Sequence, residues 1–284
     1  MKILVTGHRG FIGQHLYARL AATAADVSGY EWSDGDLPDI RGFDAVVHLG
    51  AISATTYDDL DQIMTQNYDF SIRLLHECLR HGVDLQYASS ASVYGTLTHF
   101  DEQGRLQPQS YYAWSKYLFD RYVAAHLESE RGKPGGIAIA GLRYFNVYGS
   151  TGEEHKGDMA SPYSKFCDQA LNTGRIRLFH GSDGYLRDFV CVEDVVDISL
   201  GFLESRPSGI FNIGTGKPVS FQQVAESIAD KYHAAIEYVD MPPAISNQYQ
   251  AYTCARLERL NSVMEKDWVN ILDYITHEGR PAAD

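Results

Sequence analysis

Near the start of the chain the sequence reads Gly7-His8-Arg9-Gly10-Phe11-Ile12-Gly13, directly after a short apolar run at Ile3–Thr6. The first glycine permits a tight turn, the second lets the backbone approach a pyrophosphate, and the third lets a helix pack closely on a strand. The N-terminal amides of the following helix can then bind phosphates. An ordinary glycine-rich turn is the alternative. The position between strand and helix favours a dinucleotide-binding turn made by Gly7, Gly10, Phe11, Ile12 and Gly13.

Short apolar runs recur downstream and alternate with helical patterns. Their length and composition are typical of strands that are covered on both faces. Alternating strands and helices predict an α/β fold, a Rossmann-type doubly wound parallel sheet with right-handed crossovers. The expected strands are Ile3–Thr6, Val27–Glu31, Ala45–Leu49, Leu85–Ser89 and Ile137–Leu142.

The composition of the sequence changes after about Ser150, where glycine, serine and charged residues become frequent. We therefore expect residues 1–150 to form the dinucleotide-binding domain, with segments near 187–215 returning to it. Residues 151–284 are expected to form mainly a small C-terminal substrate-binding lobe. The elements expected after Ser150 are helices at Pro162–Asn172, Asp194–Glu204 and Phe221–Tyr232 and strands at Phe189–Val192, Ile210–Ile213 and Ile236–Val239.

Charge and composition exclude several classes of protein. The 284 residues contain 24 Lys and Arg against 37 Asp and Glu, a net charge of −13, which argues against binding to nucleic acids or anionic membranes. No apolar run approaches the roughly 18 residues of a membrane span, and the N-terminus lacks the features of a signal peptide. The four cysteines form no CxxC pair, so reduced thiols are expected and no metal site. These features predict a soluble cytoplasmic protein.

Three residues have the chemistry for hydride transfer between an alcohol and a ketone. Ser90 ends the fourth expected strand, and Tyr112 and Lys116 follow it on a predicted helix, four residues apart and on one face. The lysine is expected to lower the pKa of the phenol, so that Tyr112 can act as a base, and can also bind the nicotinamide ribose. Ser90 can hydrogen-bond the reacting oxygen. A surface helix pair is the alternative for Tyr112 and Lys116 taken alone.

Two residues give conflicting indications about the cofactor. Glu31 follows the second expected strand, where a carboxylate can accept hydrogen bonds from the adenosine ribose and favour NAD. Arg9 lies in the glycine turn, where it could meet the 2′-phosphate of NADP. Both NAD and NADP stay open, with a slight preference for NAD.

The GxxGxxG spacing, followed by Ser90, Tyr112 and Lys116, resembles the extended short-chain dehydrogenase/reductase superfamily. Later blocks, Arg143-Tyr144-Phe145-Asn146-Val147-Tyr148-Gly149 and His155-Lys156-Gly157-Asp158-Met159-Ala160-Ser161, resemble the branch that acts on nucleotide sugars, above all the ADP-L-glycero-D-manno-heptose 6-epimerase family. The resemblance implies a cytoplasmic oligomeric enzyme, with a role in lipopolysaccharide biosynthesis. It also implies further cofactor contacts at Asp36, Leu37, Leu49, Gly50, Ala51, Asn67 and Val147.

The same resemblance implies a mechanism and a set of substrate contacts. A carbinol of the sugar is oxidised to a ketone, which reorients and is reduced on its other face, with Tyr112 and Lys156 as the two acid/base groups. For Lys156, contact with a substrate phosphate is the alternative. Alternatives for the whole chain are a nucleotide-sugar 4-epimerase, a 4-ketoreductase and a non-catalytic cofactor-binding sensor. The implied substrate contacts are Ser90, Asn146, Lys156, Asp158, Lys165, Phe179, Ser182 and Arg187.

Overall fold

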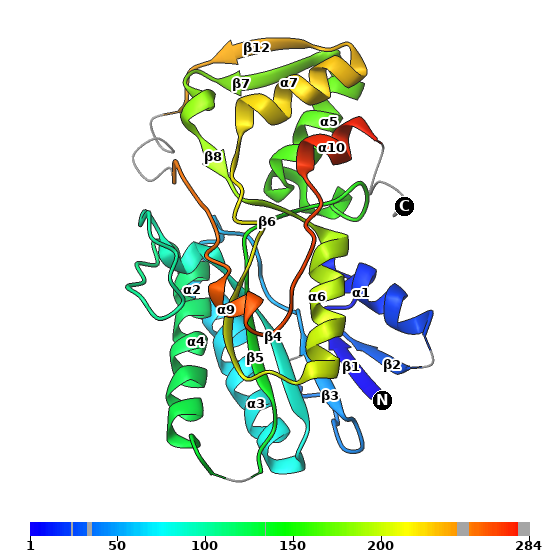
Figure 1. The fold of residues 1–284 in the computed structure, drawn as a ribbon, viewed down its shortest axis with the longest axis vertical. Helices are drawn as coiled ribbons and strands as arrows, with labels where there is room; N and C mark the ends of the chain where they lie inside the picture. The colour runs from blue at the N-terminus through cyan, green and yellow to red at the C-terminus, as the bar shows by residue number, and fades with distance from the viewer. Residues whose placement is uncertain (24, 33–35, 134, 243–249, 278–284) are drawn as a thin grey trace.

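The computed structural model describes residues 1–23, 25–32, 36–133, 135–242 and 250–277. One half of the molecule is built on a parallel sheet of six strands in the order β10-β5-β4-β3-β1-β2 (Figure 1). Its order changes direction beside β1, which opens a crevice at the carboxyl ends of the strands. The strands are β1 (Lys2–Thr6), β2 (Asp26–Tyr30), β3 (Ala45–His48), β4 (Asp84–Ser90), β5 (Ile139–Tyr144) and β10 (Gly209–Ile213).

Helices cover both faces of this sheet, as its apolar strands require. On one face α1 (Phe11–Ala21) and α6 (Val192–Ser205) pack on β1 and β3, with Leu16 and Val196 in the shared core. On the other face α3 (Phe70–His81) and α4 (Tyr111–Ser129) pack on β3 and β4 through Leu74 and Phe119. All residues of β3, β5 and β10 are buried, which explains why their sequences lack a polar alternation.

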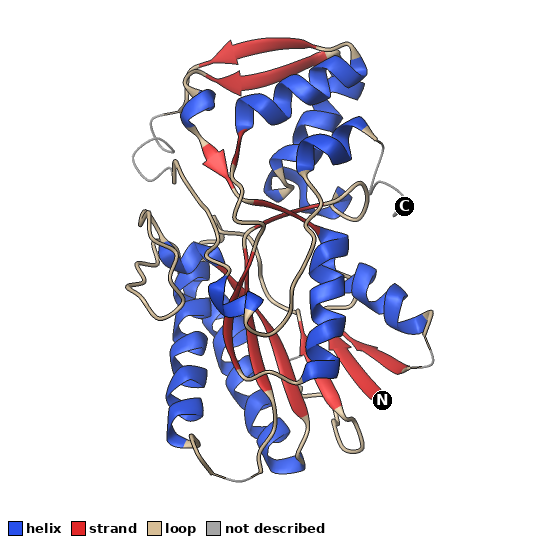
Figure 2. Ribbon diagram, in the orientation of Figure 1, coloured by secondary structure: helices blue, strands red, loops and turns tan. Residues whose placement is uncertain are grey.

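The other half is a small lobe with a separate core, shown at the top of Figure 2. Helices α5 (Pro162–Thr173), α7 (Phe221–Tyr232) and α10 (Ile271–Thr276) pack against the parallel pair β7 (Arg175–Phe179) and β12 (Ala235–Val239). Two small strand pairs lie where the halves meet. They are β6 (Asn146–Tyr148) with β9 (Phe189–Cys191), and β8 (Leu186–Arg187) with β11 (Val219–Ser220).

Shorter elements complete the described chain. The segments α2 (Leu60–Ile63) and η1 (Met64–Asp69), the latter π-helical, run without a break into α3. The others are η2 (Ala91–Tyr94), η3 (Glu154–Met159), η4 (Ser182–Gly184) and α9 (Glu258–Asn261).

The Rossmann-type sheet predicted from the sequence is confirmed, with boundaries that differ by one or two residues. The helix expected over Asp194–Glu204 begins at Val192, and the strand expected over Ile137–Leu142 runs over Ile139–Tyr144. The helices α9 and α10 were not predicted, because their short segments carry too little periodicity. Across the ranges described above, no helix is long and apolar enough to span a membrane.

Candidate active site

A cleft of about 550 Å³ lies at the carboxyl ends of the sheet strands, between the sheet and the lobe. The glycine turn forms one wall, the ends of β3, β4 and β5 form its floor, and the segment from Glu153 to Pro162 borders it from the lobe side. Many residues predicted from the sequence meet here. Those that line the cleft are Gly7, Gly10, Phe11, Ile12, Gly13, Glu31, Leu49, Gly50, Ala51, Ser90, Tyr112, Lys116, Asn146, Val147 and Lys156.

The glycine turn has no room for a side chain at Gly7 or Gly13 and presents helix N-terminal amides that can bind an anion. A Cβ on Gly13 would lie 2.0 Å from the Gly7 oxygen, and one on Gly7 would lie 2.5 Å from the Gly50 nitrogen. The N-cap of α1 is Gly10, which supplies no side-chain cap, and the first amide to bond within the helix is that of Gln14. The amides of residues 11–13 therefore have no partner within their own helix, and the turn fits a pyrophosphate.

Glu31 is held against this turn. Its Oε1 accepts a hydrogen bond from the Arg9 amide at 2.7 Å and lies 3.1 Å from His8 Nδ1. The His8 ring in turn lies over Gly29, where a Cβ would come within 2.5 Å of it. The carboxylate is about one third exposed and lines the cleft, so it fits an adenosine ribose. The Arg9 side chain is not among the cleft-lining groups.

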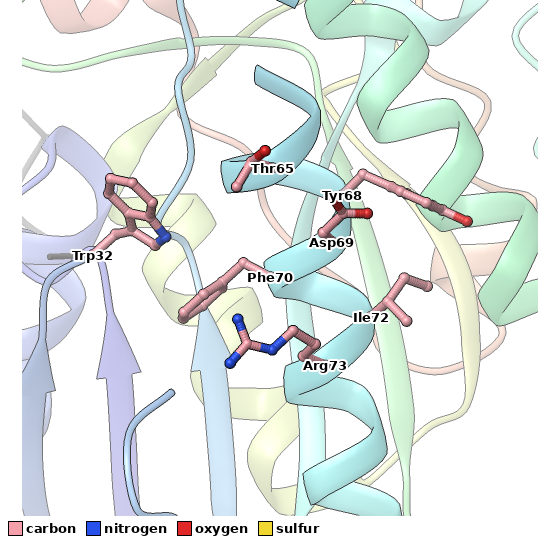
Figure 3. Close-up of a pocket in the computed structure, with 7 residues that line it drawn as sticks. All are labelled: Trp32, Thr65, Tyr68, Asp69, Phe70, Ile72 and Arg73. Carbon is pink, nitrogen blue, oxygen red and sulfur yellow. The ribbon is translucent and has the colours of Figure 1, made fainter. Parts of the chain in front are cut away.

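A second cavity of about 480 Å³ is lined by Trp32 and by residues of η1 and α3 (Figure 3). Trp32 lines both cavities, and Phe70 and Arg73 of α3 lie across from it in the second one. The sequence had placed Asp36 and Leu37 at the adenine side, and neither lines these cavities. The Asp36 carbonyl accepts a hydrogen bond from the Tyr30 hydroxyl, and Leu37 packs against the core of the sheet. Trp32, which was not predicted as a site residue, lines both cavities instead.

Asn67, predicted as a cofactor contact, lies behind the cleft wall. It is buried, its Oδ1 accepts from the Ile52 amide at 2.8 Å, and its Nδ2 donates to the Ile52 carbonyl at 2.9 Å and to Ser115 Oγ at 3.2 Å. Asn67 does not line the cleft. It ties the loop after β3 to α4, and so fixes the backbone beside Leu49, Gly50 and Ala51.

The three residues expected to carry hydride-transfer chemistry lie together in the cleft. Ser90 ends β4, and Tyr112 and Lys116 occupy the first turns of α4, which is capped by Ser110. Lys116 Nζ lies 5.9 Å from the centre of the Tyr112 ring and donates a hydrogen bond to the Ala88 carbonyl at 2.9 Å. A single strand end and a single helix start therefore hold all three side chains.

Burial dominates the protonation behaviour of these groups. It lowers the pKa of Lys116 to about 8, and the Asp120 carboxylate acts in the opposite direction. The sequence predicted a lowered pKa for Tyr112, but the net direction in the protein is upward. Burial of the phenol outweighs its hydrogen bond with Ser90, and Asp120 raises the pKa further. The spacing of Tyr112 and Lys116 carries no information on burial, which is the largest cause of the raised pKa.

A buried charge pair that was not predicted from the sequence links α4 to β5. Asp120 Oδ2 accepts from Arg143 Nε at 2.8 Å and from Ser89 Oγ at 2.9 Å, and Oδ1 accepts from the Tyr87 hydroxyl at 3.0 Å. Both charged residues are about 1% exposed. Asp120 lies one helical turn after Lys116, a spacing visible in the sequence. Its partner comes from a distant strand and has no local signal.

Lys156 lies in the same cleft on a different element. Its Nζ is 4.1 Å from the centre of the Phe11 ring and 3.2 Å from Glu153 Oε2. Burial lowers the pKa of Lys156, and the Glu153 carboxylate opposes that shift. Glu153 also lines the cleft and was not predicted as a site residue.

The predicted substrate contacts are less uniform in position. Asn146 lines the cleft, and its backbone N–H donates a hydrogen bond to the Asp188 carbonyl at 3.0 Å. Arg187 lies outside it, with its guanidinium 5.2 Å from the centre of the Phe221 ring and Nη1 donating to the Leu186 carbonyl. The side chain of Asp158 is outside the described part of the structure. Three other predicted substrate contacts lie on the lobe and do not line the cleft. They are Lys165, Phe179 and Ser182.

Comparisons with known proteins identify a matching family model and similar solved structures. Residues 3–214 match the model of the NAD dependent epimerase/dehydratase family. Among solved structures, ADP-L-glycero-D-manno-heptose-6-epimerase from Helicobacter pylori is 25% identical, with 97% of this chain and 95% of that chain covered and a TM-score of 0.83.

Two 4-epimerases share the fold at lower identity. UDP-N-acetylglucosamine 4-epimerase from Methanobrevibacter ruminantium, solved with UDP-N-acetylmuramic acid, is 23% identical, with 93% of this chain and 92% of that chain covered and a TM-score of 0.82. UDP-glucuronic acid 4-epimerase from Bacillus cereus, solved with UDP-glucuronic acid and NAD, is 22% identical, with 97% of each chain covered and a TM-score of 0.81.

Proposed function

The chain belongs to the NAD-dependent epimerase/dehydratase family, and from that premise we propose that it epimerises a nucleotide-activated sugar. The observation that carries the proposal is that Tyr112 and Lys156, two groups able to exchange protons, line one cleft from different elements. An epimerase that oxidises and re-reduces one carbon meets its substrate in two orientations. Two proton-exchanging groups around one site suit that requirement.

NAD is the cofactor we propose, within a family that uses NAD or NADP. The amides of residues 11–13 would bind its pyrophosphate, Glu31 its adenosine ribose, and Lys116 its nicotinamide ribose. A carboxylate at the Glu31 position would repel the 2′-phosphate of NADP, which favours NAD. Trp32 would border the adenine. When bound, the nicotinamide supplies the acceptor and donor of hydride.

Side chains of the protein would bind the reacting hydroxyl of the sugar and transfer its proton. Ser90 and Tyr112 would hold the reacting hydroxyl in one orientation, and Tyr112 would take its proton as the alcohol becomes a ketone. Lys156 would serve the other orientation. Asn146 would bind a hydroxyl of the sugar.

An epimerase is favoured over a sugar-nucleotide 4,6-dehydratase by the residues beside Ser90. Those dehydratases resemble this chain but carry an Asp-Glu pair directly after the catalytic Ser or Thr. Here the positions are Ala91 and Ser92, which supply no acid for the elimination of water.

Among sugars, an ADP-glycero-manno-heptose epimerised at carbon 6 is the substrate we propose. The resemblance of residues 143–149 and 155–161 and the similarity to the Helicobacter pylori enzyme support it. A nucleotide-sugar 4-epimerase is the second candidate, supported by the shared fold of the two 4-epimerases.

The proposal is tested by native mass spectrometry for bound cofactor, followed by a panel of ADP-heptoses, UDP-hexoses and UDP-hexuronic acids in deuterated water. We expect tightly bound NAD and an epimer of one sugar without solvent deuterium at the inverted carbon. Stoichiometric consumption of added NADPH would instead indicate a ketoreductase, and deuterium at that carbon would indicate deprotonation. Unchanged turnover in Tyr112→Phe would overturn the assignment of Tyr112.

A further inference from the structure

A buried carboxylate beside Lys156 is fixed by a residue other than the lysine. Glu153 is 3% exposed. Its Oε1 accepts from Ser161 Oγ and its Oε2 from the Ser161 amide, both at 2.7 Å. Ser161 is the N-cap of α5, and its Oγ also accepts the Ser164 amide at 3.2 Å. The carboxylate is thus anchored to the start of a lobe helix, independently of its contact with Lys156.

Lys156 has access to the cleft, whereas its partner is shielded. About 22% of the Lys156 side chain is exposed, against 2% for Glu153. The ammonium lies over the Phe11 ring, and Phe11 belongs to the cofactor turn. Glu153 lines the same cleft, but Ser161 binds both of its carboxylate oxygens, so its charge acts on a substrate mainly through Lys156.

We propose that Glu153 is a positioning residue for Lys156: anchored by Ser161, it holds the lysine over Phe11 and favours return of a proton to it after each turnover. This inference rests on the proposed function, in which Tyr112 and Lys156 serve the two orientations of the sugar.

The need for a returned proton follows from the balance of the reaction. Oxidation in the first orientation sends the hydroxyl proton to Tyr112 and a hydride, with its two electrons, to the oxidised nicotinamide. Reduction in the second orientation takes that hydride back and takes a proton from Lys156. A cycle that starts from the Tyr112 phenolate and the Lys156 ammonium leaves Tyr112 protonated and Lys156 neutral, so one proton must move from Tyr112 back to Lys156 before the next cycle. A carboxylate within 3.2 Å favours the charged amine and therefore this return.

Several groups around Lys156 bear on its protonation. Glu153 on the same segment favours the ammonium, and the face of the Phe11 ring on α1 attracts a cation. Burial disfavours the ammonium. Tyr112 and Lys116 line the same cleft from α4, and Ser161 of α5 contacts the carboxylate. Among these groups, Glu153 is the one acid.

The first test needs no substrate. The wild type, Glu153→Gln and Ser161→Ala are pulse-labelled with acetic anhydride across a pH series, and modification of Lys156 is followed by mass spectrometry. Loss of the carboxylate should lower the pKa of Lys156 and so raise its labelling rate at neutral pH about tenfold. Ser161→Ala should give a smaller rise, because it frees the carboxylate without removing it. Lys165 on α5 serves as the internal control, and its profile should not change.

The second test is a double-mutant cycle on turnover of the nucleotide sugar that the wild type epimerises. Glu153→Gln should lower kcat about tenfold with little change in KM, and Lys156→Met should lower it much more. If Glu153 acts through Lys156, the double variant should be no slower than Lys156→Met alone.

The outcomes separate the two proposals. An unchanged labelling profile in both Glu153→Gln and Ser161→Ala, or additive losses in the cycle, overturns the role of Glu153 and leaves the epimerase proposal standing. A wild type that epimerises no nucleotide sugar overturns the proposed function, and the labelling profile then decides the Glu153–Lys156 pairing by itself. If Glu153→Gln fails to fold, Ser161→Ala decides the labelling test.

Discussion

Replacing Asp120 with Asn should destabilise the protein far more than a single carboxylate usually does. Asp120 is about 1% exposed and accepts hydrogen bonds from Arg143, Ser89 and Tyr87. An amide of the same shape removes the charge and leaves Arg143, also about 1% exposed, as an uncompensated buried cation. Breaking a buried pair in this way costs about 3–5 kcal/mol in the free energy of unfolding, or about 10 °C in melting temperature for a chain of this size.

The measurement is urea denaturation of the wild type and the variant, with Glu128→Gln as the matched control. Glu128 lies on the same helix and pairs with Arg131 at 3.6 Å, but both side chains are more than 70% exposed. That control should change the free energy of unfolding by less than about 1 kcal/mol. A double variant, Asp120→Leu with Arg143→Met, should be more stable than Asp120→Asn alone, because it removes both charges. Equal losses in Asp120→Asn and Glu128→Gln would refute the reasoning.

Three further predictions concern the cofactor site. Gly13→Ala should abolish binding of NAD, measured by calorimetry, because the added Cβ would lie 2.0 Å from the Gly7 oxygen; unchanged affinity would contradict the tight turn. Glu31→Ser should reduce the preference for NAD over NADP at least tenfold in the ratio of dissociation constants, since it removes the charge that opposes a 2′-phosphate; an unchanged ratio would count against that role. Lys116, whose pKa is lowered to about 8, binds fewer protons in the folded than in the unfolded state between about pH 8 and 10.5, so its contribution to stability should rise with pH across that window. Lys116→Met should remove that rise from the pH dependence of the free energy of unfolding. A slope identical to that of the wild type would exclude a lowered pKa for Lys116.

The sequence predicted features whose signal is local. The glycine turn, Ser90, and the pair of Tyr112 and Lys116 each depend on spacing within one strand end or one helix, and the structure brings them to one cleft. The resemblance to enzymes of nucleotide sugars is confirmed at the level of the family.

What the sequence did not predict depends on contacts between distant segments. Arg143 meets Asp120 from another element, and Glu153 is recognisable only because Ser161 turns back to it. The hydrogen bonds of Asn67 were not predicted for the same reason, because its partners Ile52 and Ser115 come from separate segments. The net pKa of Tyr112 required the burial of the phenol, which no local pattern encodes.

The position of β10 at one edge of the sheet has a consequence for how the chain folds as it is synthesised. The ribosome releases β1 to β5 first, then β6 and the first lobe elements, and only later α6 and β10. Until residue 213 has left the exit tunnel, the apolar surface of β5 and the face of β1 and β3 that α6 covers stay open to water. A nascent chain stalled before that point exposes the unpaired edge of β5, which is able to pair with other chains.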